Sequence, residues 1–359
     1  MIRTTRRRAA LLLFGALSAL TVLAGVAPPA SAARGQEAGD AEAGFTSLTL
    51  LNGWVPYGSG TSAPKVRISN GIVEFKGAMG GGTLPAAFVL PAGMRPTRKV
   101  FIPVDLCSAA NGRLVIKPDG TTRVEAESNF SDATCFTSLE GASFALAPAA
   151  QVALPLINGW TNGAAGTRSA AAAVVGGVVH LSGAIRTNGT SKNPFVIPVG
   201  MRPAATIFVP IDLCSASDGR LRIGSSGVVT VQTSGNFSDA QCFTSLDGAT
   251  WVVNPTAQTP LALENGWTGQ PYHTRVPRAG LVNGVVRLSG AIADGTGSEV
   301  FTLPPTLAPS RLVYIQVDLC GATNGRLVID THGVADVDSE GELGDAQCFT
   351  SLEGASFLR

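Results

Sequence analysis

Apolar and polar residues alternate along this chain in short runs, and turn-forming residues separate one run from the next. Residues 66–68 alternate, Asn70-Gly71 interrupts the pattern, and residues 72–75 resume it. Two short alternating runs on either side of an Asn-Gly step are typical of a β-hairpin. Asn283-Gly284 and Gly176-Gly177 interrupt similar runs later in the chain, so we expect the same hairpin three times.

Further short runs predict further strands, and no segment keeps the 3.6-residue period of a helix over several turns. In the first part of the chain these runs cover residues 87–90, 99–106, 113–117, 122–127 and 139–146. Glycine accounts for 43 of the 359 residues, which suits many tight turns. The pattern predicts an all-β fold, built as β-sandwiches or Greek-key barrels.

The chain repeats one sequence three times. An Asn-Gly-Trp pattern ends at Trp54, Trp160 and Trp267, and a Cys-Phe-Thr-Ser-Leu pattern begins at Cys135, Cys242 and Cys348. The period is 106 or 107 residues, which is the size of a whole domain and far longer than a solenoid unit. We therefore expect three tandem β domains, at residues 47–146, 154–253 and 261–359.

Short connections join these domains, at residues 147–153 and 254–260, and each contains proline. Seven residues span at most ~25 Å, whereas a domain of this size has a radius of gyration near ~13 Å. The domains must therefore touch or nearly touch. We expect a monomer with three contacting domains.

The N-terminal segment predicts export. Arg6-Arg7-Arg8 precedes an apolar run over residues 9–26, and Ala30-Ser31-Ala32 forms a small-residue cleavage site. This order defines a secretory signal peptide over residues 1–32. A twin-arginine signal is the alternative, but the residues after the arginines match it poorly. Residues 33–46 are small and polar, so we expect a disordered leader.

Removal of the signal peptide makes the chain weakly acidic and leaves it without a predicted anchor. Four arginines leave with it, so 22 basic residues face 25 acidic ones and the net charge becomes −3. This balance offers no footprint for nucleic acid or an anionic membrane surface. No second apolar span follows. We expect a secreted, extracellular protein with no membrane anchor.

Six cysteines fall two to a repeat. The pairs are Cys107 with Cys135, Cys214 with Cys242, and Cys320 with Cys348, each separated by 28 positions. A constant spacing inside each repeat of an exported chain predicts three disulfides within the repeats. Metal binding is the alternative, but the pairs lack a CxxC arrangement and no histidine stands at an equivalent position in all three copies. We expect no metal and no cofactor.

Turn and strand-edge residues carry a resemblance to a known family. Residues 90–96 read Leu-Pro-Ala-Gly-Met-Arg-Pro, residues 138–144 read Ser-Leu-Glu-Gly-Ala-Ser-Phe, and the second copy keeps similar strings at 198–203 and 246–251. These strings resemble the C-terminal head domains of bacteriophage tail fibres and receptor-binding proteins. The third copy departs from them, because residues 303–309 lack the Gly-Met-Arg core.

The resemblance implies β-barrels that trimerise and bind surface saccharides. Three fused copies could reproduce such a trimer within one chain, as a covalent pseudo-trimer. Fusion would raise the effective concentration of each partner. The alternative is an extended rod. The cysteine pairs and the export signal are not features of that family, and they suggest a secreted bacterial relative adapted to oxidising conditions.

The sequence predicts no catalytic residue. His180, His273 and His332 lie at non-equivalent positions, and no metalloprotease, nucleophile-elbow or phosphate-loop motif is present. Several acids recur in every copy: Asp105, Asp132 and Glu140, then Asp212, Asp239 and Asp247, then Asp318, Asp345 and Glu353. Paired carboxylates could support glycosidic chemistry, which keeps a hydrolase as a minor alternative. We expect instead that they cap backbone N–H groups or pair with arginine.

Aromatic residues beside turns are the candidate ligand contacts. They are Trp54, Tyr57, Trp160, Trp267 and Tyr272. Flat aromatic faces at a loop can stack on sugar rings. The alternative is that each tryptophan closes the end of its barrel as a core residue.

Segments that differ between the copies are further candidates. They are residues 58–64, 163–170 and 268–277, and residues 80–85, 186–194 and 293–299. Loops on a rigid scaffold often carry specificity, although exposed turns also drift without consequence. We therefore expect a non-catalytic binding protein for a cell-surface or extracellular glycan. The alternative is a structural or protein-interaction module without a small-molecule site.

Overall fold

A computed structural model describes residues 44–146 and 150–359. Antiparallel strands dominate both ranges, which confirms the all-β prediction. The predicted signal peptide, most of the predicted leader and residues 147–149 lie outside the described residues. No helix among the described residues is long and apolar enough to cross a membrane.

Each repeat contains a similar succession of elements. The first repeat holds β1 (Thr46–Ser47), β2 (Val55–Pro56), β3 (Lys65–Ser69), β4 (Ile72–Lys76), β5 (Ala78–Gly80), β6 (Ala86–Val89), η1 (Ala92–Met94), β7 (Val100–Asp105), η2 (Cys107–Ala109), β8 (Asn111–Ile116), β9 (Thr121–Ala126), α2 (Phe130–Cys135), β10 (Thr137–Ser138) and β11 (Ser143–Ala145). The second holds β12 (Val152–Ala153), β13 (Trp160–Asn162), η3 (Ala164–Gly166), β14 (Ala171–Val175), β15 (Val178–Ser182), β16 (Ala184–Thr187), η4 (Val199–Met201), β17 (Ile207–Asp212), η5 (Cys214–Ala216), β18 (Asp218–Ile223), β19 (Val229–Thr233), α3 (Phe237–Cys242), β20 (Thr244–Ser245) and β21 (Thr250–Val252). The third holds η6 (Pro255–Ala257), β22 (Thr259–Pro260), β23 (Thr268–Gly269), η7 (Pro271–His273), β24 (Arg278–Val282), β25 (Val285–Ser289), β26 (Ala291–Ala293), β27 (Glu299–Thr302), β28 (Val313–Asp318), η8 (Cys320–Ala322), β29 (Asn324–Ile329), β30 (Val334–Ser339), α4 (Leu343–Cys348), β31 (Thr350–Ser351) and β32 (Ser356–Phe357).

Three antiparallel sheets make up each repeat. In the first repeat their strand orders are β1-β3-β4-β11, β10-β5-β2 and β6-β9-β8-β7. In the third repeat they are β22-β24-β25-β32, β23-β26-β31 and β27-β30-β29-β28. The second repeat has sheets β12-β14-β15-β21, β13-β16-β20 and β17-β18-β19, so it follows the same plan except for the edge strand that β6 and β27 provide in the other repeats. The repeated sequence therefore folds into the same topology each time.

The predicted hairpins are present in all three copies. They are β3 with β4, β14 with β15, and β24 with β25. Asn70 and Gly71 have φ of 50° and 79°, the left-handed conformation that a two-residue hairpin turn of this kind requires. The Asn-Gly step therefore sets the register of the hairpin.

Each repeat buries its own apolar core. In the third repeat this core includes Trp267, Val286, Phe301, Ile315 and Phe357, all at most 5 % exposed. These side chains come from two of the three sheets of the repeat and from the loop before β23. Alternation along β30 sends Ala335 and Val337 into this core, whereas β25 is buried along its whole length.

The connections between repeats contribute strands. Residues 147–153 and 254–260 contain β12 and β22, which pair with β14 and β24 of the repeats that follow them. The structured part of each later repeat therefore begins inside the segment expected to be a linker. The short strands escaped prediction because two residues give no readable alternation.

The structure confirms the three disulfides predicted from the spacing. They join Cys107 to Cys135, Cys214 to Cys242, and Cys320 to Cys348. A six-residue helix, α2, α3 or α4, ends at the second cysteine of each pair. These helices were not predicted, because six residues are too few to show a helical period.

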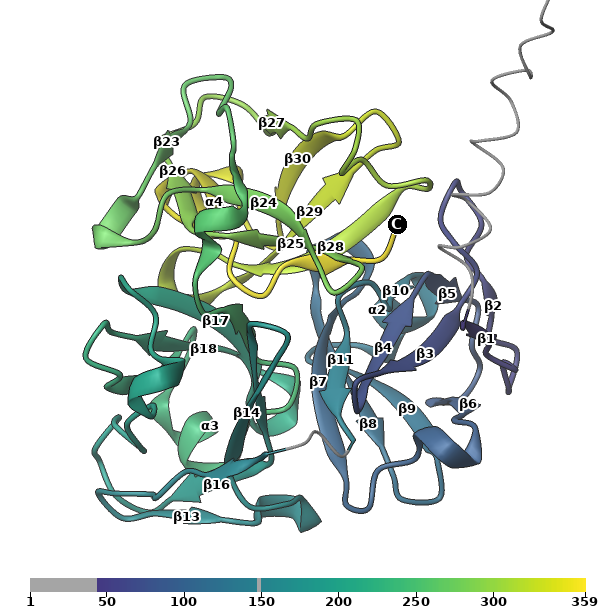
Figure 1. Ribbon diagram of the computed structural model, residues 1–359. Coiled ribbons are helices and arrows are strands. Elements are labelled where there is room, and N and C mark those ends of the chain that lie inside the picture. The colour runs from purple at the N-terminus through teal and green to yellow at the C-terminus, as the bar shows by residue number, and fades with distance from the viewer. Residues whose placement is uncertain (1–43, 147–149) are drawn as a thin grey trace, which may run out of the picture. The chain divides into compact units, whose positions relative to one another are not determined.

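The three repeats contact one another through equivalent elements. Strands β7, β17 and β28 each contact the other two (Figure 1). The described residues, 44–146 and 150–359, accordingly belong to one structural unit. This arrangement creates three interfaces between repeats.

Candidate binding site between the second and third repeats

The three tryptophans are core residues. Trp54, Trp160 and Trp267 are 3 %, 4 % and 5 % exposed. Each indole Nε1 donates to a backbone carbonyl oxygen, at Leu84, Ser191 and Gly297 respectively. This is a correction to the sequence-based candidates, because a ring with both faces packed and its N–H bonded cannot stack on a sugar. The alternative reading, that each tryptophan closes its own barrel, fits the structure.

One recurring set of carboxylates holds the backbone. Glu140, Asp247 and Glu353 are buried, and each accepts a hydrogen bond from a backbone N–H, at Gly77, Gly183 and Gly290. Burial raises the pKa of Glu140 and of Asp247 to about 7. Carboxylates that accept from the backbone in this way fix a turn.

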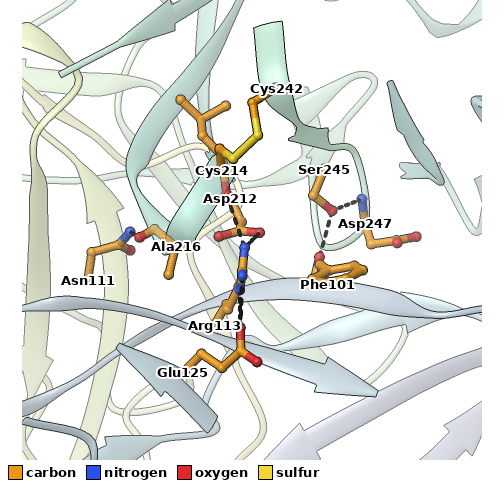
Figure 2. Close-up of polar contacts among 11 residues, drawn as sticks. Phe101, Asn111, Arg113, Glu125, Asp212, Cys214, Ala216, Cys242, Ser245 and Asp247 are labelled. Carbon is orange, nitrogen blue, oxygen red and sulfur yellow. Dashed lines mark hydrogen bonds and ion pairs between the residues drawn. A yellow bond between two sulfur atoms is a disulfide. The ribbon is translucent and has the colours of Figure 1, made fainter. Parts of the chain in front are cut away.

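A second recurring set joins one repeat to the next. Arg113 on β8 donates through Nη1 to Asp212 Oδ2 of the second repeat at 3.2 Å and to the Leu213 carbonyl oxygen at 3.1 Å. Its Nε and Nη2 donate to Glu125 on the neighbouring strand β9 at 2.9 and 2.8 Å (Figure 2). Burial raises the pKa of Asp212 to about 7, although the charge of Arg113 acts in the opposite direction.

The same contact recurs at the other two interfaces and closes a cycle. Arg220 of the second repeat bonds to Asp318 of the third at 3.0 Å. Arg326 of the third repeat lies 3.7 Å from Asp105 of the first. An arginine of each repeat thus contacts an aspartate of the next repeat, and the arginine of the third repeat contacts the aspartate of the first. This is the contact pattern of a closed heterologous trimer within one chain.

The interface between the second and third repeats departs from this pattern at two positions. Gln232 stands on β19 where Glu125 and Asp338 bind the corresponding arginines, and its Oε1 accepts from Arg220 Nε at 2.7 Å. Arg222 stands where the other copies have Val115 and Val328. Arg222 is exposed, and it has no ion-pair partner among the described residues. At these two positions, the interface therefore has one acidic side chain fewer and one basic side chain more than the other two interfaces.

The opposite wall of this interface also departs from the other copies. Tyr272 and His273 lie in η7, at positions held by Ser59-Gly60 in the first repeat and Ala165-Gly166 in the second. Tyr272 is 60 % exposed and its φ is 54°. A bulky residue in the left-handed conformation is unfavourable by about 1 kcal/mol or more. The turn keeps this conformation in each copy, but only here does it carry a large aromatic ring.

The Tyr272 ring packs against Phe349 and lies close to the Cys320–Cys348 disulfide. Its centroid lies 5.6 Å from that of Phe349, and its hydroxyl lies 3.9 Å from Cys348 Sγ. Phe349 in turn packs edge-on against Phe208 of the second repeat at 4.9 Å. The guanidinium carbon of Arg220 lies 4.7 Å from the Phe208 ring centroid. A disulfide, two phenylalanines and an arginine therefore form the base of this site.

These copy-specific residues line one pocket of about 420 Å³. Its walls are Phe208, Arg220, Arg222 and Gln232 from the second repeat and Tyr272, His273, Cys320, Gly321 and Phe349 from the third. At the equivalent interface between the first and second repeats, Val115 and Ala164 are buried in an apolar cluster with Phe243. Arginine in place of valine therefore accompanies an open pocket in place of a packed one.

Two of the sequence candidates lie at such interfaces. Tyr272 lines the pocket, in the copy-variable segment 268–277. Tyr57 is 38 % exposed and packs edge-on against Phe136 at 4.7 Å, at the interface between the third and first repeats. Sequence reasoning missed Arg222 and Gln232. The signal for them was present, because each breaks a residue type that the other two copies share.

A separate acidic group lies where the three repeats meet. Oxygen atoms of Glu127, Asp218 and Glu340, one from each repeat, lie within 4.8 Å of one another. Burial and the neighbouring carboxylates raise the pKa of Asp218, and burial with Glu127 raises that of Glu340 to about 7. Such a group could hold a cation, but acidic clusters are common without one. We assign no metal site here.

Comparisons with known proteins identify no family. No family model matches the chain, and no curated protein matches it. A search of solved structures returns a complex of BBS1N with ARL6DN, at 11 % identity and a TM-score of 0.13, covering 84 % of this chain and 99 % of that chain. A likeness this weak carries no argument about fold or function.

Proposed function

We propose that this protein is a secreted, non-catalytic binding protein that recognises a cell-surface or extracellular glycan through the pocket lined by Tyr272. The observation that carries the proposal is the exposed Tyr272 ring, which stands beside polar side chains in a pocket of about 420 Å³. Pockets of this size accept small ligands, and a few polar groups fix their orientation. An aromatic face with hydrogen-bonding neighbours suits a sugar ring.

Two further observations support this role. Six of the nine recurring acids have structural partners in the backbone or in arginines, which accounts for those six without catalysis. The three disulfides and the N-terminal apolar run suit a protein that works outside the cell. The resemblance to tail-fibre head domains agrees with glycan recognition.

The test is a glycan array probed with residues 33–359, produced under oxidising conditions. The wild-type chain should retain at least one class of glycan. Tyr272→Ser, which places in the third copy the residue found at position 59, should reduce that signal about tenfold or more. Tyr57→Ser is the matched control, because it removes a tyrosine from the equivalent stack on Phe136. Equal binding by wild type and Tyr272→Ser would contradict the proposal.

One observation favours the alternative, a protein-interaction module. Ile68, Val174 and Leu281 occupy equivalent positions on the three hairpins and are 44 %, 40 % and 54 % exposed. Exposed aliphatic residues at repeated positions suit a partner protein. A crosslinked partner that is lost in Leu281→Ser and kept in Tyr272→Ser would favour this alternative.

A further inference from the structure

We propose that the Tyr272 pocket selects an acidic saccharide, one whose sugar carries a carboxylate. This inference rests on the proposed function, because it names the chemical class of the ligand for the same pocket. It is carried by a difference between copies. The second repeat turns Arg220 and Arg222 toward this pocket, and none of the residues that line it carries a carboxylate.

The Nη2 atom of Arg220 makes no hydrogen bond to a described residue, although Nη2 of the equivalent arginines does. In the other copies, Nη2 of Arg113 and of Arg326 donates to Glu125 Oε2 at 2.8 Å and to Asp338 Oδ2 at 3.0 Å. Nη2 of Arg220 has no hydrogen bond to any described residue, since Gln232 accepts only from Nε. Arg220 Nη2 is therefore available to donate to a ligand, whereas the same atom of Arg113 and Arg326 is paired with an acid.

The remaining contacts of Arg220 keep its side chain in place. Its Nη1 donates to Asp318 at 3.0 Å and to the Leu319 carbonyl oxygen at 2.9 Å, and its guanidinium packs on the Phe208 and Phe349 rings. A guanidinium held by these four contacts loses little freedom when it binds a ligand. Such preorganisation favours affinity.

Arg222 adds a second cation on the same face of the sheet. Arg220 and Arg222 are two residues apart on β18, so both side chains project from the same side of the strand. The two other interfaces have valine at that position. The first has an extra Arg123, but it lies 3.8 Å from Glu125, and the third has Asp336 beside its valine. An excess of positive charge is therefore specific to the pocket that contains Tyr272.

A carboxylate is the group that best fits this arrangement. Guanidinium groups bind carboxylates through paired, charge-assisted hydrogen bonds, which are about twice as strong as neutral ones. The Tyr272 ring supplies the flat face for the sugar to which the carboxylate belongs. A neutral sugar would leave Arg220 Nη2 without an acceptor and would gain nothing from Arg222.

The experiment compares two probes that differ only in having a carboxylate or a hydroxymethyl group on each sugar. The acidic probe is an oligogalacturonate, and the neutral probe is the same oligomer after reduction of its carboxyl groups. Binding to residues 33–359 is measured by titration calorimetry for the wild type, Arg222→Val and Gln232→Glu. These substitutions copy Val115 and Glu125 of the first repeat, so both side chains are already accommodated by the same fold. Arg123→Val is the control.

Our inference predicts that the wild type binds the acidic probe at least about tenfold more tightly than the neutral one. Arg222→Val and Gln232→Glu should remove most of this preference, and added salt should weaken it. Arg123→Val should keep it. Acetate alone should compete weakly, because it offers no ring to Tyr272.

Two results would overturn the inference, and they differ in what they leave standing. Equal affinity for both probes, unchanged by Arg222→Val, rejects the acidic ligand. If Tyr272→Ser still weakens binding in that case, glycan recognition by the pocket stands. If neither probe binds and no glycan on an array depends on Tyr272, the acidic ligand and the proposed function both fall.

Discussion

Arg113 Nη1 donates to Asp212 Oδ2 across 3.2 Å, and this hydrogen bond joins the first repeat to the second through residues that lie 99 positions apart in the chain. Asp212 is fully buried and Arg113 is 13 % exposed. If Arg113 were removed, little water could therefore reach the Asp212 carboxylate to hydrogen-bond to it. The same relationship recurs around the cycle of repeats, so the packing of the three copies depends on charges that each copy supplies to the next.

Loss of Arg113 should destabilise the protein. Arg113→Ala leaves the Asp212 carboxylate buried without its partner, and we expect the free energy of unfolding to fall by about 3 kcal/mol. Urea denaturation followed by circular dichroism measures this change. Arg186→Ala, at an exposed position on β16, is the control and should shift the midpoint little. The double variant Arg113→Met with Asp212→Leu should recover much of the loss, and a deeper loss would contradict our account.

Asp218→Asn should stabilise the protein at neutral and alkaline pH. Burial, Glu127, Glu340 and Asp318 raise the pKa of Asp218 above its ordinary value. The folded state therefore binds this proton more tightly than the unfolded state. Stability from this group is full at low pH and falls as the pH rises through the folded pKa. Asparagine carries no charge to repel, so its variant should lose less stability as the pH rises.

The hydrogen bonds of the other copies add to this effect. Asn111 and Asn324 stand at the equivalent positions, and their Nδ2 atoms donate to the carbonyl oxygens of Ala216 and Ala109. Asparagine at position 218 could make the third such bond, worth about 1 kcal/mol. Thermal unfolding at pH 5 and pH 8 tests this. A variant less stable than wild type at pH 8 would show that the carboxylate has a favourable partner.

Trp267 and Tyr272 should separate stability from binding. Trp267→Ala removes a buried ring and leaves the Gly297 carbonyl oxygen without its donor, and we expect a loss of about 3–5 kcal/mol. Tyr272→Ser changes a side chain that is 60 % exposed, and the free energy of unfolding should change by less than about 0.5 kcal/mol. Chemical denaturation and glycan binding are measured on both variants. A large stability loss in Tyr272→Ser would give that ring a structural role.

The sequence predicted well what depends on neighbours in the chain or on the repeat itself. The Asn-Gly steps gave the hairpins, and a spacing of 28 positions gave all three disulfides. Tryptophan in every copy was compatible with a plug or with a ligand contact. Only the burial of the ring distinguishes these readings, because identical copies keep a core residue as readily as a functional one.

The candidate site could be predicted only in part. Tyr272 stood out as an aromatic residue in a variable loop, but Arg222 and Gln232 lie on strands of a different repeat. Their proximity to Tyr272 follows from how the repeats pack, which no local pattern encodes. Departures of one copy from the other two were the usable signal, and they point to one specialised interface among three.

Two disulfides should differ in their effect on binding. Removing Cys320 and Cys348 by serine substitution should lower the free energy of unfolding by about 3–4 kcal/mol, from the loop that the bridge closes. It should also weaken glycan binding, because Cys320 lines the pocket and Cys348 contacts the Tyr272 hydroxyl.

The control for this prediction is the bridge of the first repeat. Serine at Cys107 and Cys135 removes a disulfide that closes a loop of the same length. The stability loss should therefore be similar, while glycan binding should stay within about twofold of wild type. Both pairs are compared at a temperature where each variant remains folded by circular dichroism. If both serine pairs lose glycan binding equally, the pocket is not the site that recognises the glycan.

The central claim is that three copies of one fold carry a single specialised ligand site. Calorimetric titration of residues 33–359 with the oligogalacturonate probe, or with the glycan that an array identifies, measures the number of sites directly. We predict one equivalent of ligand per chain, with Tyr272→Ser abolishing that site and Tyr57→Ser keeping it. Three equivalents per chain, or one equivalent that survives Tyr272→Ser, would contradict the claim.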